Sequence, residues 1–492
     1  MNNSKRYLKQ KGSLLIQAIV FGAIAVVIIG GLISWAGVNI KASRITLQRE
    51  QALQVAEAGV DYYRWHLAHA STDYRDGTGV PGPYVHNFLD KDGVVIGSFT
   101  LEITPPPVGS TIVTVKSTGR VLSDPSLYRS IVVQLAIPSL AKFAIASNSD
   151  IRFGEGTEVF GPIHSNGGIR FDGVAHNLIT SSRDSYDDPD HTGAVEFGVH
   201  THINPPPSSG SNSSFRALEA PPSLVQNRTD VFNVGRLFPV PAVDFVGFTT
   251  DLAQIKSNAQ SSGRYLSGSG ALGYRIVLRT NDTFDVYRIN NLKSAPNGCS
   301  DSQGQTGWGT WSIRTSGSGN QTLISNYPIP ANGLIFVEDN VWVEGQINTA
   351  RVTIASGRFP DNASTRTNIT VNNNLLYTNY NGLDVISLIA QGNINAGLDS
   401  IDTLRIDAAL VAQNGRVGRY YYSSSCGSSY QRNSITLYGM IASNIRYGFA
   451  YTDNTGYDVR NIIYDGSLLY GPPPSFPLTS DQYSVISWSE VQ

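Results

Sequence analysis

An uncharged stretch near the amino terminus constrains the fold of this chain more than any other sequence feature. No Asp, Glu, Lys or Arg occurs between Lys11 and Lys41, and the apolar run from Leu14 to Val38 can cross a hydrocarbon layer about 30 Å thick as a helix. This run is longer than the apolar core of a signal peptide. Basic residues precede it, and by the positive-inside rule that end stays cytoplasmic. We therefore expect a single-pass membrane protein with a transmembrane helix over residues 13–40 and its bulk outside the cytoplasm.

The helix is expected to continue beyond the membrane as an amphipathic segment over residues 41–70. This segment contains no Pro and only one Gly, Gly59. Apolar residues recur in it at spacings of three and four, as they do on the buried face of a helix. They are Leu53, Ala56, Val60, Tyr63 and Leu67. The sequence thus predicts one long helix, with its first half in lipid and its second half packed against a domain.

Three features of this region together resemble type IV pilin-like proteins of the PilX-type minor pilin or pseudopilin group. They are the basic leader of residues 1–12 ending at Gly12, the apolar run from Ser13, and the Ala-Glu-Ala-Gly segment at Ala56–Gly59. The resemblance implies that a prepilin peptidase cuts between Gly12 and Ser13. It also implies that the freed helix packs with other pilin-like subunits in the core of a filament.

Two positions depart from the pattern of major pilins. The first residue after the predicted cut is Ser13 rather than Phe or Met, and the fifth is Gln17 rather than Glu. In the family that glutamate is thought to offset the charged amino terminus of a neighbouring subunit, and an uncompensated charge in hydrocarbon costs several kcal/mol. Gln17 can only hydrogen-bond, so we expect a minor subunit, located at the tip or initiating assembly. The alternative is a plain, uncleaved membrane anchor, which explains the same hydropathy.

The remainder of the chain has the composition of a β protein. Residues 71–138 contain three strand-like runs, 94–104, 111–121 and 128–137, separated by turn-forming residues, which predict an antiparallel meander. A long helix that leads into a meander is the plan of a pilin head. The fold class is therefore mainly β, with one long amino-terminal helix, a pilin-like meander and a further large β domain.

Short strands punctuated by Gly and Asn fill much of that further domain. They occupy residues 139–204 and 331–492 and favour a β-solenoid such as a β-helix, in two segments. No strict repeat length is visible, so a β-sandwich or jelly roll remains the alternative. Residues 205–263 are rich in Pro and Ser and predict a linker, with one short helix within 244–262. Residues 264–330 predict a β insertion.

Composition and motifs narrow the function. The 36 Lys and Arg against 38 Asp and Glu give a net charge of −2, which disfavours nucleic acid as a partner. Minimal motifs of Ser hydrolases, metalloproteases and P-loop nucleotide binders are absent, so we expect no enzyme, no catalytic residues and no cofactor. Surface polysaccharide or a protein receptor is the expected partner of the β domain, through tyrosines such as Tyr420–Tyr422 and Trp308 and Trp311. A membrane-anchored β-helix protein that binds or processes envelope polysaccharide is the alternative function.

A cluster of histidines and acidic residues suggests a metal site. Five of the eight histidines fall between His164 and His202, among several aspartates and Glu196. His200 and His202 would project from one face of a strand, and His191 with an aspartate would complete a ligand set. The spacing matches no established signature, and solvated loop side chains are the alternative.

The two cysteines lie far apart in the sequence, at Cys299 and Cys426, which excludes CxxC motifs. They form either one long-range disulfide or two reduced, buried thiols.

Overall fold

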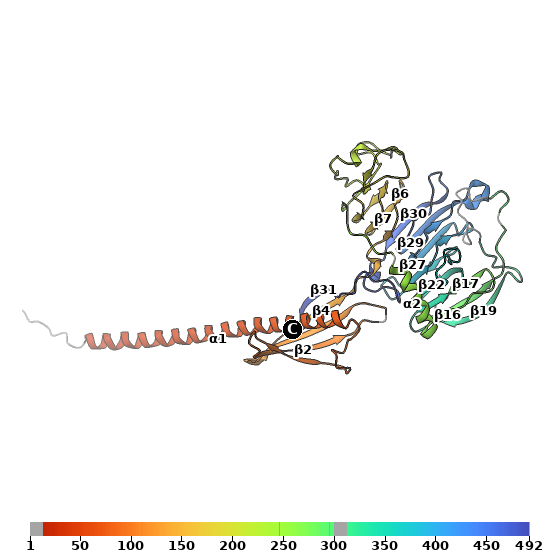
Figure 1. Ribbon diagram of the computed structural model, residues 1–492. Coiled ribbons are helices and arrows are strands. Elements are labelled where there is room, and N and C mark those ends of the chain that lie inside the picture. Colours follow the sequence, from red (N-terminus) through yellow and green to blue (C-terminus); the bar gives the residue numbers. More distant parts are fainter. Residues whose placement is uncertain (1–12, 108, 246, 295, 300–311, 492) are drawn as a thin grey trace, which may run out of the picture. The chain divides into compact units, whose positions relative to one another are not determined.

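The computed structural model describes residues 13–107, 109–245, 247–294, 296–299 and 312–491 (Figure 1). These form two compact units. The first contains the described residues up to Pro105, together with Val113–Leu135 and the end of the chain from Gln482. The second contains Pro106–Ile112 and Ala136–Asp481.

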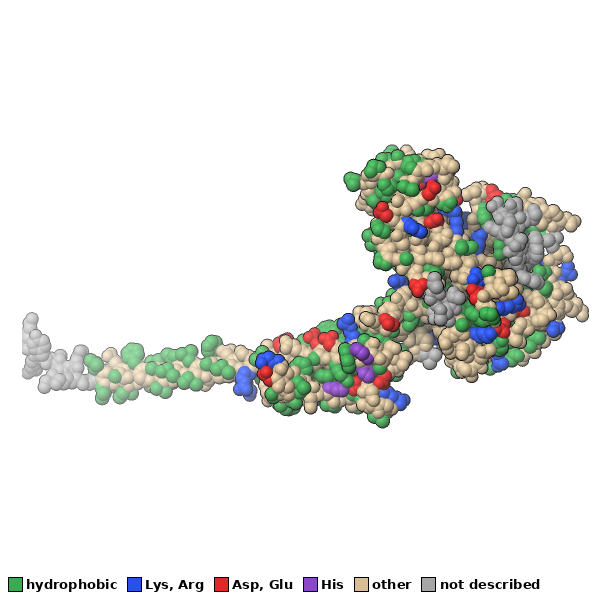
Figure 2. All heavy atoms as spheres, in the orientation of Figure 1, with side chains coloured by type: hydrophobic (Ala, Val, Ile, Leu, Met, Phe, Trp, Pro, Cys, Tyr) green, Lys and Arg blue, Asp and Glu red, His purple; other side chains and the backbone are tan. Residues whose placement is uncertain are grey.

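The first unit begins with α1, a single helix of 57 residues over Ser13–His69. Its first half is long and apolar enough to cross a membrane, and none of that segment is buried within the chain. Large apolar side chains there are open, for example Leu14 at 77% and Val27 at 74% exposed, and Figure 2 shows hydrophobic side chains along this part of the helix. The predicted continuous helix over residues 13–70 is confirmed, and it ends at His69.

The second half of α1 packs against an antiparallel sheet. The sheet is five-stranded, in the order β1-β2-β3-β4-β31. Its strands are β1 (Tyr84–Leu89), β2 (Val95–Thr104), β3 (Val113–Val121), β4 (Asp124–Ala136) and β31 (Ser484–Val491). The predicted meander corresponds to β2, β3 and β4, which pair in sequence order.

The last strand corrects the predicted domain boundaries. Residues 482–492 were expected at the end of the main solenoid segment, but β31 joins the sheet of the first unit beside β4. Arg129 forms an ion pair with Glu490 across this edge. Alternation along a strand predicts its two faces and says nothing of its partner, so the sequence could not place β31.

The buried stripe of α1 is close to the predicted one. Ala56, Val60, Tyr63 and Leu67 are at most 6% exposed, as predicted. Ala52 and Val55 are also buried, whereas Leu53 is only half-buried. The observed stripe is therefore shifted slightly around the helix at residues 52–55, where the buried part of α1 begins.

Parallel strands build the second unit, in three walls of stacked rungs. The first wall pairs in register throughout. In spatial order it contains β16 (Arg264–Leu266), β20 (Leu334–Val337), β22 (Arg351–Ser356), β25 (Val385–Ala390), the ends of β27 (Thr403–Ala412) and β29 (Gln431–Ser443), β5 (Ile145–Ser147), β8 (Ile163–Ser165), β11 (Ile179–Ser181) and β15 (Arg236–Leu237).

The other two walls follow the same spatial order. The second contains β17 (Gly273–Leu278), β21 (Val341–Gln346), β23 (Ile369–Thr370), β26 (Ile394–Ala396) and β28 (Val417–Arg419), then β6 (Ile151–Phe153), β9 (Ile169–Phe171) and β14 (Val199–His200). The third contains β24 (Leu375–Leu376), the starts of β27 and β29, β30 (Gly456–Tyr464), β7 (Glu158–Phe160) and β10 (Val174–Ala175). This parallel pairing is that of a β-solenoid and differs from the antiparallel pairing of a sandwich.

Like residues stack on one another from rung to rung. Ile441, Ile145, Ile163 and Ile179 are consecutive partners in the first wall, and all four are fully buried. Such stacks form the continuous apolar core of the unit. The rungs are not stacked in the order of the sequence. The rungs formed by residues 145–237 stack on the rung that ends at β30, although they come earlier in the chain.

A helix returns the chain from the last rung to the first. Helix α2 (Gly247–Ser262) packs its Leu252, Ile255 and Ala259 on apolar residues of the first wall, including Leu334 and Phe336. The predicted linker thus contains the short helix that we expected within residues 244–262. The remaining short helices are η1 (Leu140–Lys142), η2 (Ala217–Glu219), η4 (Ser424–Tyr430) and η5 (Gly466–Leu468).

Residues 264–330 are only partly an insertion. β16 and β17 pair in parallel with β20 and β21, and so form the first rung of the solenoid. β18 (Thr283–Ile289) and β19 (Gln321–Pro328) then extend β17 as an antiparallel sheet. The insertion therefore begins after β17, and the predicted start at residue 264 is too early. The sequence pattern of β16 and β17 predicts strands but does not reveal that their neighbours are parallel.

Candidate metal centre

Five side chains that carry metal-binding atoms meet near the last rungs of the solenoid. Residues Ser185–Tyr186 (β12) and Glu196–Phe197 (β13) form a short antiparallel pair. Asp188 and His191 lie in the loop between these strands, Glu196 on β13, His200 on β14 and His202 just beyond β14. One nitrogen or oxygen atom from each of the five lies within 4.8 Å of all the others.

The separations between these atoms are short. Nε2 of His200 lies 3.1 Å from Oε2 of Glu196 and 3.5 Å from Oδ2 of Asp188. Nε2 of His191 lies 2.5 Å from Oε2 of Glu196 and 3.6 Å from Oδ2 of Asp188. Nε2 of His202 lies 3.1 Å from Oε2 of Glu196. All three Nε2 atoms therefore face the carboxylate of Glu196, and those of His191 and His200 also face that of Asp188.

Backbone groups hold the cluster from outside. Nδ1 of His200 lies 3.3 Å from the carbonyl oxygen of Phe197, and Nδ1 of His202 lies 2.5 Å from that of Asn212. The amide of Arg216 donates to Oε1 of Glu196 at 3.0 Å. Since a carbonyl oxygen only accepts hydrogen bonds, Nδ1 of both histidines is the donor. Their Nε2 atoms are thereby fixed toward Glu196, and that of His200 also toward Asp188.

The cluster is buried and strongly polar. Every one of the five side chains is at most 3% exposed. Burial raises the pKa of Asp188, but the close approach of His200 and the charge of Arg170 outweigh it and lower this pKa to about 2. Burial likewise raises the pKa of Glu196, but the close approach of His200 and His202 lowers it well below its usual range. Both carboxylates are therefore ionised at neutral pH.

The guanidinium of Arg170 lies next to the cluster. Buried Arg170 donates from Nε to Asp172 at 2.7 Å, and its Nη1 lies 3.7 Å from Oδ2 of Asp188. Asp172 also accepts a hydrogen bond from the amide of His202 at 2.8 Å. The guanidinium of Arg170 is thus shared between two aspartates, with its shorter contact to Asp172.

The structure brings together all three predicted histidine ligands, His191, His200 and His202. The predicted aspartate is Asp188, whereas Asp184 and Asp187 are exposed. Asp190 instead pairs with Arg446 at 2.7 Å. Glu196, which the sequence placed only in the surrounding cluster, faces all three histidines. Its position next to Phe197 in an alternating strand gave no signal of this role.

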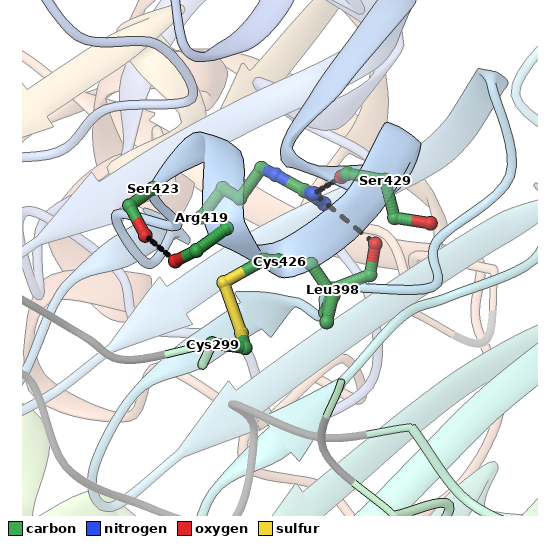
Figure 3. Close-up of a disulfide and its surroundings, with 7 residues drawn as sticks. Cys299, Leu398, Arg419, Ser423, Cys426 and Ser429 are labelled. Atoms are coloured by element: carbon green, nitrogen blue, oxygen red, sulfur yellow. Dashed lines mark hydrogen bonds between the residues drawn. A yellow bond between two sulfur atoms is a disulfide. The ribbon is translucent and has the colours of Figure 1, made fainter. Parts of the chain in front are cut away.

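The two cysteines form a disulfide, Cys299–Cys426 (Figure 3). Cys426 is 1% exposed and lies in η4. Beside it, buried Arg419 donates to the carbonyl oxygens of Leu398 and Ser429 at 3.1 and 2.6 Å. The disulfide thus ties Cys299 to a rigid, hydrogen-bonded part of the solenoid.

Two of the three consecutive tyrosines expected at a recognition surface are in the core. Tyr420 and Tyr422 are at most 6% exposed, because alternate residues of an extended chain point to the same face. Tyr451 lines a cleft of about 1230 Å³ together with Arg416 and Arg460. Trp308 and Trp311 lie outside the described residues.

The predicted processing site is only partly described. Gly12 lies outside the described residues, and Ser13 is the first residue of α1. Gln17 lies on the exposed, apolar half of α1.

Comparisons with known proteins assign no family to the chain. No family model matches the sequence, and neither does any curated protein. Among solved structures, the competence-associated pilin ComZ from Thermus thermophilus is similar, at 14% sequence identity and a TM-score of 0.28. The match covers 90% of this chain and 97% of that one. A TM-score of this size does not establish a shared fold.

Proposed function

We propose that this chain is a non-enzymatic, pilin-like minor subunit of a type IV pilus or related secretion filament. In this proposal it carries a large extracytoplasmic β domain that serves assembly or adhesion. The observation that carries the proposal is the two-part character of α1: its first half exposes apolar side chains, and its second half is packed on an antiparallel sheet of its own unit.

An exposed apolar helix needs an apolar surrounding. Burying its side chains contributes about 25 cal/mol per Å² of apolar area, so the first half of α1 is stable in lipid or among other apolar helices. Because α1 is one uninterrupted helix, the position of its apolar half sets the position of the sheet on which its second half packs. Such a subunit can move from membrane to filament without refolding. We accordingly place the partners of α1 in the membrane and among other pilin-like subunits.

Processing by a prepilin peptidase is tested at Gly12. Replacing Gly12 by Val removes the small residue before the predicted cut, and we expect the precursor to accumulate and to be absent from sheared filaments. Ser4→Ala, which changes the leader away from the cut, is the matched control. Unchanged gel mobility and filament content of the Gly12→Val protein would contradict the proposal.

The minor character of the subunit is tested at Gln17. A Glu at this position offers a charge to the amino terminus of a neighbouring subunit, whereas the amide of Gln17 offers only hydrogen bonds. We expect Gln17→Glu to raise the amount of the protein in purified filaments, measured by immunoblot. Gln17→Ala should not raise it. An equal or lower amount of Gln17→Glu in the filaments would count against a role for this position in limiting incorporation.

A second candidate function is a membrane-anchored β-solenoid protein that binds envelope polysaccharide. The cleft lined by Tyr451, Arg416 and Arg460 favours it, because aromatic rings and guanidinium groups bind sugars and their charged substituents well. Such a protein needs no processing. Under this function, Gly12→Val would leave polysaccharide binding unchanged, whereas Tyr451→Ala would weaken it.

A further inference from the structure

We propose that Asp188, His191, Glu196, His200 and His202 bind one divalent first-row transition ion, with Zn²⁺ as its representative, in a structural metal centre. The centre would fix the irregular chain that follows the last rungs of the solenoid. It is independent of the filament function proposed above, because it concerns only the second unit of the chain.

The spacing of the donor atoms fits an ion. Around an ion with bonds of about 2.1 Å, neighbouring ligand atoms lie about 3.0 Å apart in octahedral and about 3.4 Å apart in tetrahedral geometry. Five of the six separations between histidine Nε2 atoms and carboxylate oxygens lie between 3.1 and 3.6 Å, and the sixth, between His191 and Glu196, is 2.5 Å. These five side chains are therefore spaced as ligands of one centre are spaced.

The hydrogen bonds outside the cluster orient two of the rings for metal binding. Nδ1 of His200 and of His202 each donates to a backbone carbonyl oxygen. In a neutral ring, Nε2 then carries a lone pair, and here that lone pair faces the lone pairs of a carboxylate. A cation between them converts this repulsion into coordination. An Nδ1–H bonded to a carbonyl oxygen is also the outer-shell arrangement that accompanies histidine ligands of metals.

Buried polar atoms of the cluster lack partners within the protein. Oδ2 of Asp188, Nε2 of His200 and Nδ1 of His191 are buried and make no hydrogen bond among the described residues. Leaving such atoms unpaired is unfavourable, because each has lost its hydrogen bonds to water without gaining a partner. An ion would satisfy the first two of these atoms directly.

Charge balance points the same way. Asp188 and Glu196 bring two negative charges into a buried site, while the charge of Arg170 is directed first to Asp172. One divalent ion carries the charge that balances two carboxylates. Three nitrogen donors with carboxylates and no thiolate suit Zn²⁺, Fe²⁺ or Mn²⁺ better than Ca²⁺, whose ligands are oxygens.

Burial of every ligand indicates a structural role for the ion. Catalytic zinc sites keep a position open to water or substrate, whereas structural sites are closed by protein ligands. The ligands come from the β12–β13 loop, from β13 and from β14, and His202 reaches through Asn212 to the Pro-rich chain beyond. The ion would thus join the β12–β13 loop to the solenoid wall at β14.

Metal analysis of the full chain in detergent tests the proposal. The protein is stripped with EDTA, equilibrated with ZnCl₂, passed through gel filtration in metal-free buffer and analysed by inductively coupled plasma mass spectrometry. We expect one Zn²⁺ per chain, and a higher melting temperature than for the stripped protein. No retained zinc in the folded wild-type chain would overturn the proposal, and would instead indicate a cluster held together by protonated histidines.

Neighbouring aspartates provide a matched pair of variants. Asp188→Asn should lower zinc retention about tenfold or more, whereas Asp187→Asn, at an exposed position, should retain one ion per chain. His191→Asn adds a second test, because His191 lies in a loop and its loss leaves the rungs intact; His176→Asn is its control. Equal zinc retention in Asp188→Asn, His191→Asn and their controls would overturn the assignment of the ligands.

Discussion

Close approach of α1 to its sheet depends on two glycines. A Cβ at Gly59 would lie 2.4 Å from Oγ of Ser117, and one at Gly119 would lie 2.1 Å from the carbonyl oxygen of Ala52. Both distances are too short for any real contact, so a side chain at either position would push the helix from the sheet. The glycine of the Ala-Glu-Ala-Gly segment, Gly59, is therefore needed for the close packing of α1 on the sheet.

Gly119→Ala should loosen this contact. The obstructing atoms belong to the backbone of α1 at Ala52 and Ala56, which cannot move aside as a side chain can. Overpacking of this kind costs about 1–3 kcal/mol, so we expect faster hydrogen exchange in the packed half of α1, measured by mass spectrometry. Gly154→Ala, where no atom lies within 4 Å, is the control. Equal exchange in both variants would show that the helix tolerates the displacement.

The metal ligands show what sequence can and cannot resolve at this scale. Histidines are rare in the chain, so their clustering identified His191, His200 and His202. Four aspartates lie close together in the sequence, at Asp184, Asp187, Asp188 and Asp190, and local sequence does not indicate which of them turns inward. That choice is made by the β12–β13 pairing, a contact that periodicity does not encode.

Among the elements of the second unit, α2 connects the last rung of the solenoid to the first and packs on the first wall. Besides its apolar face, α2 contributes Lys256, whose ammonium pairs with Glu338 immediately after β20. The hydroxyl of Tyr265 donates to the other oxygen of the same carboxylate. This polar contact fixes the register of the helix along the wall.

The contact should make stability depend on pH. Burial raises the pKa of Glu338, but hydrogen bonds from Lys256 and Tyr265 outweigh it and lower this pKa below 4.5. Because the folded-state pKa is the lower one, the stabilisation is present above the unfolded value and is lost as pH falls through the folded value. We expect Glu338→Gln to cost about 1 kcal/mol at pH 7 and progressively less as the pH falls below 4.5, measured by urea unfolding.

A double-mutant cycle separates the pair from other effects. Lys256→Met should remove most of the same stabilisation, and adding it to Glu338→Gln should cost little more. Additive losses in the double variant, or a cost of Glu338→Gln that does not change with pH, would show that the pair contributes nothing.

The positions of the strands along the chain were predicted better than the strands with which they pair. The runs at 94–104, 111–121 and 128–137 became β2, β3 and β4 because alternation and turn residues are local signals. β1 was not predicted, and β31 and β16 were assigned to the wrong neighbours, since parallel or distant pairing depends on the whole solenoid. The rung order, in which β5 follows β29, has no local signal at all.

At the scale of the whole molecule, the disulfide closes a loop across 127 positions. In the chain-entropy model such a loop contributes up to about 5 kcal/mol by restricting the unfolded chain. We expect Cys426→Ser to lower the melting temperature of the second unit, and dithiothreitol to lower it in the wild type but not in the variant. Two titratable thiols in the unreduced, unfolded wild type would contradict the bond.

The central claim is that α1 is a processed, pilin-like helix rather than a permanent anchor. Intact mass and amino-terminal sequencing of the protein isolated from its own membrane test it most directly. If a prepilin peptidase cuts between Gly12 and Ser13, as we propose, the mature chain begins at Ser13. A chain that begins at Met1 or Asn2 would contradict it and would make α1 a permanent anchor for a β-solenoid protein.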